Sequence, residues 1–426
     1  MAQVGIGIIG FGVVGGGVVD VLRRDRATIA ARTGVDLDLR AVVSMPPYQS
    51  TDVLGATLGK DIALITQDAQ IRIALLLVGG TTFAKDLCLA CLKAGKHVVT
   101  SNKALIAAHG DELFAVAKEN KVAVAFEAAV AGGIPIIGAL RDGLAANRIE
   151  SITGILNGTT NFILTMMEQK QWGYQQALSE AQRLGYAEAD PTLDVNGTDT
   201  AHKLAILSRI AFGIRVPLSA LRIEGIQNVT AQDMASAARL KSRIKLLAMA
   251  TQRPEGLELH VAPTLVPLDH PLAAVHMNYN GVFVVGSASG PQLFTGQGAG
   301  ALPTASAVLS DVIDVALGRA EQTFGSYGFF NQPKPPAFLA EADERTASYA
   351  RFATPDKPGI LAGITQILSV RGISIRSIYQ GETDDQGQAS IELVTHPARG
   401  GDFLEAVAEI DRKGLTTAPS VCYRRL

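Results

Sequence analysis

The chain opens with an apolar segment that glycine interrupts at short intervals. Residues 4–22 read VGIGIIGFGVVGGGVVDVL and contain seven glycines. A secretory signal needs a positively charged start and a small-residue cleavage site, and a membrane-spanning helix needs about 20 continuous apolar residues. The segment has neither feature. Residues 4–9 have the pattern of a short buried strand, and an apolar helix follows after a glycine-rich turn. We therefore expect a strand, a tight turn and a helix rather than an export signal.

The turn fits the spacing of a dinucleotide-binding fingerprint, G-x-G-x-x-G. In that fingerprint the first glycine allows the turn, the second lets the backbone approach a pyrophosphate, and the third lets the helix contact the strand. The phosphate lies at the helix N-terminus, where free N–H groups and the helix dipole favour an anion. Glycine-rich turns are common, so an ordinary turn is the alternative. The prediction is that the cofactor phosphates bind at Gly10, Phe11, Gly12, Val13, Val14 and Gly15.

Strand and helix patterns alternate through the next hundred residues. We expect strands at 35–43, 71–78, 96–100 and 122–126, and helices at 83–94 and 103–120. Alternation of this kind predicts a parallel sheet that binds ligands at the carboxyl ends of its strands. The loops 79–82, 101–103 and 127–133 follow those ends. The further cofactor-binding residues that we predict are Gly79, Gly80, Thr81, Ser101 and Lys103, together with Gly300 from a later glycine-rich turn.

Composition limits the function classes that fit this chain. A length of 426 residues favours two or three domains. The 38 basic residues nearly balance the 40 acidic ones, so we expect neither nucleic acid nor a membrane surface as a partner. Three cysteines cannot form a disulfide framework and are typical of a reducing cytoplasm. Cys88 and Cys91 form a CxxC pair; we interpret them as small buried apolar residues of a helix rather than as a redox or zinc site.

The rest of the chain divides into further units. We expect residues 1–133 to form the dinucleotide-binding domain, completed by the segment 303–325, and residues 134–302 to form an α+β domain for substrate binding and dimerisation. A proline-rich and glycine-rich linker covers 326–346. In 347–426, strands at 349–353, 373–380, 389–395 and 416–423 and helices at 360–370 and 403–410 predict a compact ferredoxin-like βαββαβ unit. The expected fold class is thus α/β, with a Rossmann-like doubly wound first domain.

The densest group of polar residues lies between positions 188 and 203. It comprises Glu188, Asp190, Asp194, Asp199 and Lys203. Asp199 and Lys203 are four residues apart, so they share a face of the predicted helix. An exposed ion pair of little energetic weight is the alternative. The pair begins a strongly apolar helix, and a buried lysine beside a carboxylate is suited to proton transfer. We therefore predict catalytic roles for Asp199 and Lys203.

Four motifs resemble one known family. The segments VVTSNKAL, GILNGTTNFIL, GYAEADPTLDVNGTDTAHKLAIL and GAGALPTASAVLSD are similar to those of homoserine dehydrogenases, and the resemblance extends from residue 4 to about 316. The segment RFATPDKPGILAGITQIL resembles the ACT domain that many bacterial members carry. The resemblance implies a reversible, NAD(P)H-dependent reduction of L-aspartate 4-semialdehyde to L-homoserine.

The resemblance also implies roles for individual residues. Lys203 matches the general acid/base, Asp199 its carboxylate partner, and Lys103 the lysine beside the nicotinamide and the substrate. Glu188 matches the residue that binds the substrate ammonium, and Asp194 belongs to the same pocket. Asn157, Gly158 and Thr159 line that pocket, with a helix N-cap as the alternative. A monovalent cation, usually sodium, matches Glu127 and the carbonyls of Val130, Gly132 and Ile134, although a plain glycine-rich crossover also fits.

Some positions depart from the family pattern. Leu76 replaces a frequent Glu, and the loop after Thr82 lacks the usual proline. After the second strand, Ser44 and the residues that follow include neither the acid typical of NAD enzymes nor the Arg typical of NADP enzymes. The absence of the acid favours NADP as the cofactor, and NAD remains the alternative.

Regulation and assembly follow from the resemblance as expectations. The turn at residues 354–359 matches the effector-binding turn of ACT domains, so L-threonine is the expected inhibitor, bound in a homodimer or homotetramer. The alternatives are a non-catalytic amino-acid sensor and a dehydrogenase of another amino-acid aldehyde. The intact residues Lys103, Glu188, Asp199 and Lys203 argue against the sensor.

Overall fold

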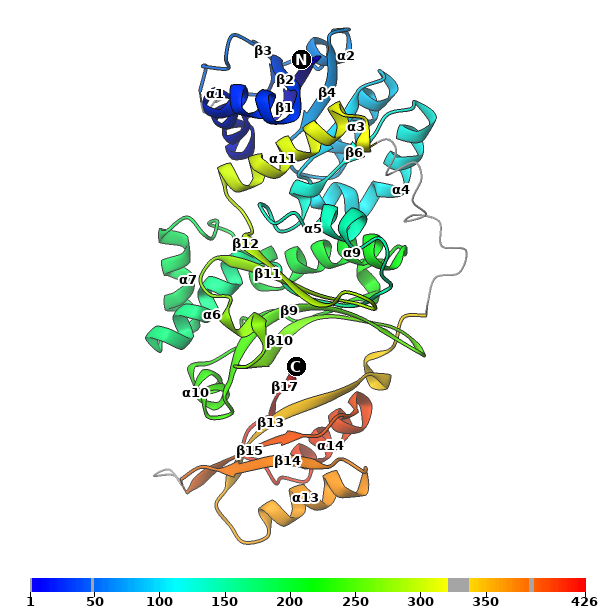
Figure 1. Ribbon diagram of the computed structural model, residues 1–426. Helices are drawn as coiled ribbons and strands as arrows, with labels where there is room; N and C mark the ends of the chain where they lie inside the picture. The colour runs from blue at the N-terminus through cyan, green and yellow to red at the C-terminus, as the bar shows by residue number, and fades with distance from the viewer. Residues whose placement is uncertain (1, 47–49, 321–336, 383–386) are drawn as a thin grey trace.

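The first domain is a doubly wound sheet, seen at the top of Figure 1. The computed structural model describes residues 2–46, 50–320, 337–382 and 387–426. Six parallel strands lie in the order β3-β2-β1-β4-β5-β6. Their bounds are Ala2–Ile9 (β1), Val35–Val43 (β2), Thr57–Gly59 (β3), Ile71–Leu76 (β4), His97–Thr100 (β5) and Val124–Ala125 (β6). The predicted parallel sheet is confirmed; β3 is an additional edge strand, and β4 ends two residues earlier than expected.

Helices cover both faces of this sheet. Side chains of β4 alternate between two cores: Ile73 and Leu75 face the core that includes α1 (Val13–Thr33), while Ala74 and Leu76 face the core of α3 (Thr82–Lys93) and α4 (Lys103–Glu119). A strand that is buried on both faces has apolar residues at successive positions rather than at alternate ones. The segment IRIALL shows this pattern.

The predicted turn before α1 is confirmed. Gly10 has φ +97°, and a Cβ there would lie 2.7 Å from Val78 Cγ1. A Cβ on Gly15 would lie 2.6 Å from the Gly10 carbonyl oxygen, whereas a Cβ on Gly12 would meet no atom within 4 Å. The first and third glycines are therefore needed for local geometry. Gly12 leaves open space at the helix N-terminus, which suits a ligand.

The second domain combines a mixed sheet with helices. Its strands are β7 (Ile149–Ile155), β8 (Arg222–Ile223), β9 (Ser242–Arg253), β10 (Gly256–Pro267), β11 (Tyr279–Gly286) and β12 (Gly290–Gln297). Its main helices are α6 (Gly158–Lys170), α7 (Tyr174–Arg183), α8 (Thr192–Val195), α9 (Thr198–Phe212) and α10 (Ala231–Arg239). Gly158 begins α6 directly after Asn157. The reason is local: Asn157 caps the helix by accepting the Thr160 N–H.

The chain then returns to the first domain through α11 (Ala301–Ala316), drawn in yellow in Figure 1. A Cβ on Gly17 of α1 would lie 2.4 Å from the carbonyl oxygen of Ala301, so the two helices meet closely. The start of α11 therefore lies against α1 of the first domain. Most of the predicted linker, residues 321–336, lies outside the described residues.

The third domain has the predicted βαββαβ order. It contains β13 (Arg345–Pro355), α13 (Ile360–Val370), β14 (Ile375–Gln380), β15 (Gln388–Thr395), the short β16 (Ala398–Arg399), α14 (Gly400–Arg412) and β17 (Val421–Arg425). The last strand was wrongly placed at 416–423. Thr416 and Ser420 instead bond back to Asp411 at the end of α14 and close the loop after that helix, while the Thr417 N–H donates to the Ala353 carbonyl of β13.

The second and third domains share one sheet. β17 pairs with β13 on one side and with β10 on the other, which gives the strand order β12-β11-β7-β9-β10-β17-β13-β15-β14. The predicted unit is therefore ferredoxin-like in its own order but does not stand apart from the substrate domain. Among the residues that the structure describes, no helix is both long and apolar enough to cross a membrane.

Candidate active site

A buried carboxylate lies between two lysines. Lys203 Nζ is 2.8 Å from Asp199 Oδ2, one turn earlier in α9, and Lys103 Nζ is 2.9 Å from Asp199 Oδ1. The Asp199 and Lys203 side chains are only 8% and 11% exposed. Lys203 also donates to the Leu156 carbonyl at 2.7 Å. The alternative of a solvent-exposed pair therefore fails, because both partners are largely withdrawn from water.

The two ammonium groups decide the charge of the cluster. Burial alone would raise the pKa of Asp199, but Lys203 and Lys103 lower the pKa well below the ordinary range of a carboxyl. Burial would lower the pKa of Lys103, but the charge of Asp199 raises it. Asp199 is therefore ionised and Lys103 protonated at neutral pH. The cluster thus holds fixed charges that can stabilise an oxyanion forming nearby.

Asn157 connects the cluster to a second carboxylate. Its side-chain N–H₂ donates to Asp194 Oδ1 at 2.7 Å and to Asp199 Oδ2 at 2.8 Å, and its Oδ1 accepts the Thr160 N–H at 2.8 Å. Burial raises the pKa of Asp194. The N-cap interpretation of Asn157 is thus confirmed. Sequence reasoning missed the amide bridge, because its partners lie 37 and 42 residues away.

Local structure explains how Lys103 reaches Asp199. Lys103 is the first residue of α4, directly after the end of β5, and Asn102 caps the helix by accepting the Leu105 N–H. Asn102 also donates to the carbonyls of Val78 and Gly80 at 2.9 and 2.7 Å. Two loops that we predicted to bind the cofactor therefore meet at the carboxyl edge of the sheet. Asn102 was not singled out from the sequence, although an Asn directly before a predicted helix is a recognisable cap signal.

The remaining cofactor residues lie around the same edge. Phe11 is buried, and its N–H donates to Ser44 Oγ at 3.2 Å. Val13 is exposed, and Thr81 and Gly300 stand directly before α3 and α11. These positions line the ends of helices that point at the nucleotide-binding edge. Their contacts with a cofactor stay a prediction.

Glu188 lies near the cluster without a hydrogen bond to it, and its charge raises the pKa of Lys103. It lies exposed between α7 and α8, where its carbonyl accepts from Gln182 at 3.2 Å. Within the described residues, no hydrogen bond or ion pair joins its carboxylate to Lys103, Asp199 or Asn157. Thr159 donates to the Tyr186 carbonyl at 2.5 Å, so the start of α6 is tied to the segment that precedes Glu188.

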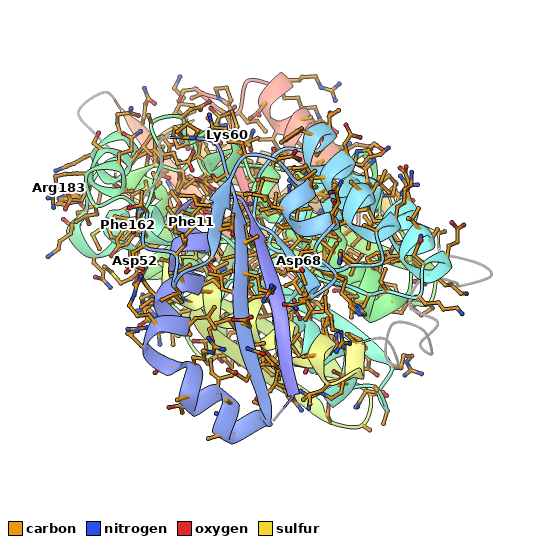
Figure 2. The ribbon with its side chains drawn as sticks, turned by 90° about the horizontal axis from the view of Figure 1, so that it is seen from above. Phe11, Asp52, Lys60, Asp68, Phe162 and Arg183 are labelled. Carbon is orange, nitrogen blue, oxygen red and sulfur yellow. The ribbon has the colours of Figure 1, made fainter. Side chains whose placement is uncertain are left out.

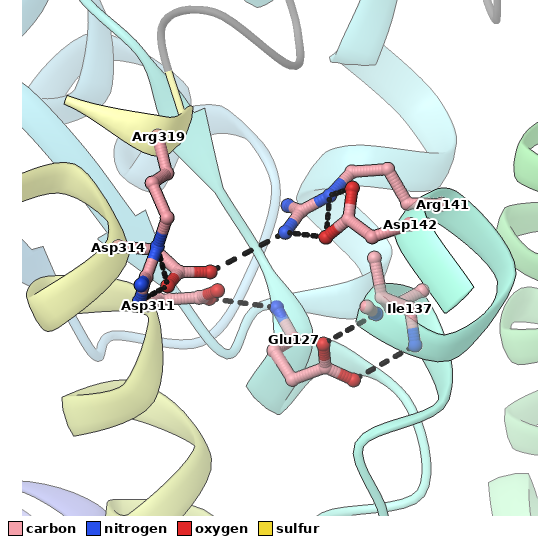
Figure 3. Close-up of polar contacts among 8 residues, drawn as sticks. Glu127, Ile137, Arg141, Asp142, Asp311, Asp314 and Arg319 are labelled. Carbon is pink, nitrogen blue, oxygen red and sulfur yellow. Dashed lines mark hydrogen bonds and ion pairs between the residues drawn. The ribbon is translucent and has the colours of Figure 1, made fainter. Parts of the chain in front are cut away.

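The candidate cation site is built around a buried carboxylate, shown in Figure 3. Glu127 is 7% exposed, and its two oxygens accept the N–H groups of Ile137 and Gly138 at 2.8 and 2.7 Å. Its own N–H donates to Asp311 of α11 at 2.7 Å. Burial raises the pKa of Glu127 and of Asp311. A carboxylate in this setting retains acceptor capacity for a hard cation.

The carbonyls predicted to complete that site lie in a tight turn. Val130 and Gly132 flank Ala131, which has φ +56°, and Gly132 has φ +50°. The Ile134 carbonyl accepts the Ile136 N–H at 2.8 Å, so one of its lone pairs is already used. Carboxylate and carbonyl oxygens are suitable ligands for a monovalent cation. Binding of a cation at this site stays a prediction.

The cysteine interpretation agrees with the structure. Cys88 and Cys91 are fully buried in α3, and burial raises the pKa of both thiols to about 12. They are absent from the one group of potential metal ligands found in the described part of the chain, which comprises Glu258, His260 and Glu344.

A doubly wound sheet whose carboxyl edge places Lys103 against Asp199 of α9, one turn from Lys203, suits a dinucleotide-dependent enzyme. Comparison with known proteins narrows this class. The family model of homoserine dehydrogenase matches residues 135–313, the model of its NAD-binding domain matches residues 10–127, and an ACT domain model matches residues 348–414.

Relatives match over the full length. A homoserine dehydrogenase of Pseudomonas aeruginosa is 44% identical over all of this chain and 99% of its own length. The crystal structure of a homoserine dehydrogenase from Thiobacillus denitrificans has a TM-score of 0.91 at 41% identity, covering 100% and 99% of the two chains. A hyperthermophilic archaeal homoserine dehydrogenase mutant in complex with NADPH has a TM-score of 0.62 at 28% identity and covers 74% of this chain and 98% of its own. The chain belongs to the homoserine dehydrogenase family, NAD(P)-dependent oxidoreductases, and carries a C-terminal ACT domain.

Proposed function

We propose that this chain reduces L-aspartate 4-semialdehyde to L-homoserine with Lys203 as the proton donor. The observation that carries the proposal is the buried Lys203 ammonium, fixed at 2.8 Å from Asp199 and 2.7 Å from the Leu156 carbonyl. The nicotinamide supplies the hydride when it is bound. Lys203 gives a proton to the aldehyde oxygen as that oxygen becomes an alcohol, and it takes the proton back in the reverse direction.

The neighbouring residues have supporting roles in this proposal. Asp199 orients both lysines, and its charge keeps Lys103 protonated. Lys103 adds a second positive charge beside the reacting carbonyl. The substrate ammonium binds at the acidic side of the pocket, which is formed by Glu188 and Asp194, and the substrate carboxylate binds at the N-terminus of α6, which includes Asn157, Gly158 and Thr159.

The experiment compares Lys203→Met and Lys203→Arg with the wild type. Loss of the proton donor is expected to lower kcat by about 10³-fold for Lys203→Met, within the range typical of general acid catalysis. The affinity for NADPH, measured by fluorescence titration, is expected to stay within about twofold. If Lys203→Met retained wild-type kcat, the assigned role would be wrong.

We propose NADP(H) as the preferred cofactor. The Ser44 N–H donates to the Gly59 carbonyl at 2.9 Å. Lys60 follows Gly59 directly in the chain and therefore lies near Ser44. Figure 2 labels Lys60 in a view down onto this domain. Lys60 supplies a cation near Ser44, which stands where NAD enzymes usually carry an acid, and this favours a 2′-phosphate over free ribose hydroxyls. Lys60→Glu is expected to lower kcat/KM for NADPH at least tenfold with little change for NADH, and the exposed Lys118→Glu serves as the control.

Glu127, Val130, Gly132 and Ile134 hold a monovalent cation, sodium, in this proposal. The support is the buried carboxylate of Glu127 beside a turn with two successive positive φ angles. Glu127→Gln is expected to require a higher sodium concentration for half-maximal rate. A sodium response equal to that of the wild type would contradict the site.

The ACT domain binds L-threonine in this proposal and lowers activity. Support comes from the turn at 354–359, which leads through Gly359, φ +91°, into α13. We propose a cytoplasmic homodimer or homotetramer with the domain boundaries 1–133 plus 303–325, 134–302 and 347–426, joined by the linker 326–346. Initial rates with and without L-threonine test the regulation, and sedimentation tests the assembly. Robust turnover would also exclude the non-catalytic sensor.

A further inference from the structure

A lysine that the reaction does not use directly is buried beneath α6. Lys245 of β9 is 1% exposed, and its Nζ donates to Asn161 Oδ1 at 2.9 Å and to the Val275 carbonyl at 2.7 Å. Both acceptors are neutral. In the described part of the chain no ion pair includes Lys245, and the acid that faces it, Glu168, is held by Arg243 at 2.7 Å. The one acid that acts on Lys245 in the described part is therefore shared with Arg243, and Lys245 has no ion pair of its own.

The lysine acts on the part of α6 that faces the candidate substrate pocket. Asn161 follows Asn157 by four residues, which corresponds to about 6 Å along a helix. Its side-chain N–H₂ donates to the carbonyls of Val275 and Tyr279 at 3.2 and 3.0 Å. Lys245 thus completes a network that fixes the first turns of α6. The N–H groups at the start of this helix already favour an anion, and a cation below them strengthens the same field.

A buried charge of this kind is costly unless it has a use. Leaving an ammonium in the protein interior with only neutral acceptors opposes folding, whereas a methionine of similar length fits an apolar layer without that cost. Two hydrogen bonds to Asn161 and Val275 do not require a cation, since a neutral donor serves as well. The charge itself therefore calls for an explanation.

We propose that Lys245 is a positioning residue for the substrate carboxylate: its charge beneath α6 draws the α-carboxylate of the amino-acid substrate to the N-terminus of that helix. The inference rests on the proposed function, because it takes the substrate to be an α-amino acid bound at Asn157, Gly158 and Thr159. The charge of Lys245 would then give the enzyme a preference for substrates that carry a carboxylate next to the amino group.

The same placement predicts a pH dependence. Burial lowers the pKa of Lys245 to about 8. The charge of Arg243 lowers this pKa further, and the charge of Glu168 raises it. Besides Glu168 and Arg243, the titratable group that faces Lys245 is His276, and burial lowers the pKa of this histidine as well. Lys245 is thus charged below pH 8 and loses its charge as the pH rises through 8. Binding of the substrate carboxylate is expected to weaken over that interval.

The experiment measures the oxidation of L-homoserine by the full-length enzyme. Lys245→Met is expected to raise KM for L-homoserine about tenfold at pH 7.2, with kcat and the KM for NADP⁺ within about twofold of wild type. Lys241→Met, an exposed lysine at the start of the same segment, is the matched control. A merely structural role would instead change kcat or both KM values together, and that result would overturn the proposal.

The wild type provides a second test that needs no variant. Its KM for L-homoserine is expected to rise between pH 7 and pH 9 around a midpoint near 8, beyond the rise shown by Lys245→Met, while the KM for NADP⁺ stays flat. A wild-type KM for L-homoserine that is flat through pH 8 would refute the proposal even if Lys245→Met did not fold. Failure of the proposed function gives a different result, because the wild type would then not oxidise L-homoserine at all.

Discussion

At the scale of single residues, Asp199 is the group on which the others depend. It accepts hydrogen bonds from Lys203 and Asn157 and pairs with Lys103. The contact with Lys203 could be predicted, because residues four apart share a helix face. The contacts with Asn157 and Lys103 could not, since no local periodicity relates residues 42 and 96 positions away. The sequence thus predicted the residue types of the site better than their geometry.

Asp199→Asn removes the charge that holds both lysines. Lys103 and Lys203 would then repel each other without a counter-charge, so we expect kcat to fall by at least about 10²-fold. Stability should also change with pH. The pKa of Asp199 is lowered in the folded state, so its stabilising effect is present above about pH 4 and is lost as the pH falls through the lowered pKa.

Urea unfolding at pH 7 and pH 3 measures this effect. The stability difference between wild type and Asp199→Asn is expected to be clear at pH 7 and smaller at pH 3. A difference that did not shrink in acid would show that the ion pairs are not its source.

At the scale of elements, α10 joins the substrate domain to the ACT sheet. Asp233 forms a capping box with Thr230 and also accepts from Arg351 of β13 at 2.7 Å and from the Tyr423 hydroxyl of β17 at 3.1 Å. One buried carboxylate therefore serves both the start of a helix and a contact between domains. Ser236 and Arg239 of the same helix bind Glu392 of β15.

Asp233→Ala is expected to cost about 3–5 kcal/mol, because it leaves the Arg351 charge buried and unpaired. Thr230→Ala removes only the cap and is expected to cost about 1 kcal/mol. Equilibrium urea unfolding of both variants gives the comparison. Equal losses in the two variants would mean that the contact between α10 and the ACT sheet contributes little.

Elements differ in how well their bounds follow from the sequence. The bounds of α13 and β2 agree with the prediction at both ends, because each is a regular apolar pattern between clear stop signals. The last strand was misplaced because Thr416 and Ser420 donate side-chain hydrogen bonds to Asp411 and so close the loop after α14. Local propensity did not reveal this competition.

At the scale of the whole molecule, one sheet runs from the active-site domain into the ACT domain. β17 pairs in parallel with β10 and antiparallel with β13. β10 pairs with β9, β9 with β7, and β7 ends directly before Leu156 and Asn157 of the site. The element order of the first and third domains was predictable from element patterns. The join between them was not, because it depends on strand pairing between residues about 160 positions apart.

A buried histidine at this join gives a pH prediction. His260 is 1% exposed between Glu258 and Glu344, and burial lowers its pKa well below the usual value, with Arg424 and Arg222 acting in the same direction. The unfolded chain takes up a proton near pH 6.5 that the folded chain does not, so stability rises with pH up to about 6.5 and then levels. His260→Gln is expected to flatten the acidic side by up to about 1.4 kcal/mol per pH unit.

Thermal unfolding of wild type and His260→Gln from pH 5 to pH 8 measures this difference. Parallel profiles for the two proteins would show that His260 is not the group that titrates.

The most direct test of the central claim is the initial rate of NADPH oxidation by purified protein with L-aspartate 4-semialdehyde, in the presence of sodium. We predict a saturable rate that depends on both substrates, is higher with NADPH than with NADH, and is lost in Lys203→Met. The account would be contradicted by a folded protein that binds NADPH but leaves it unoxidised with this aldehyde.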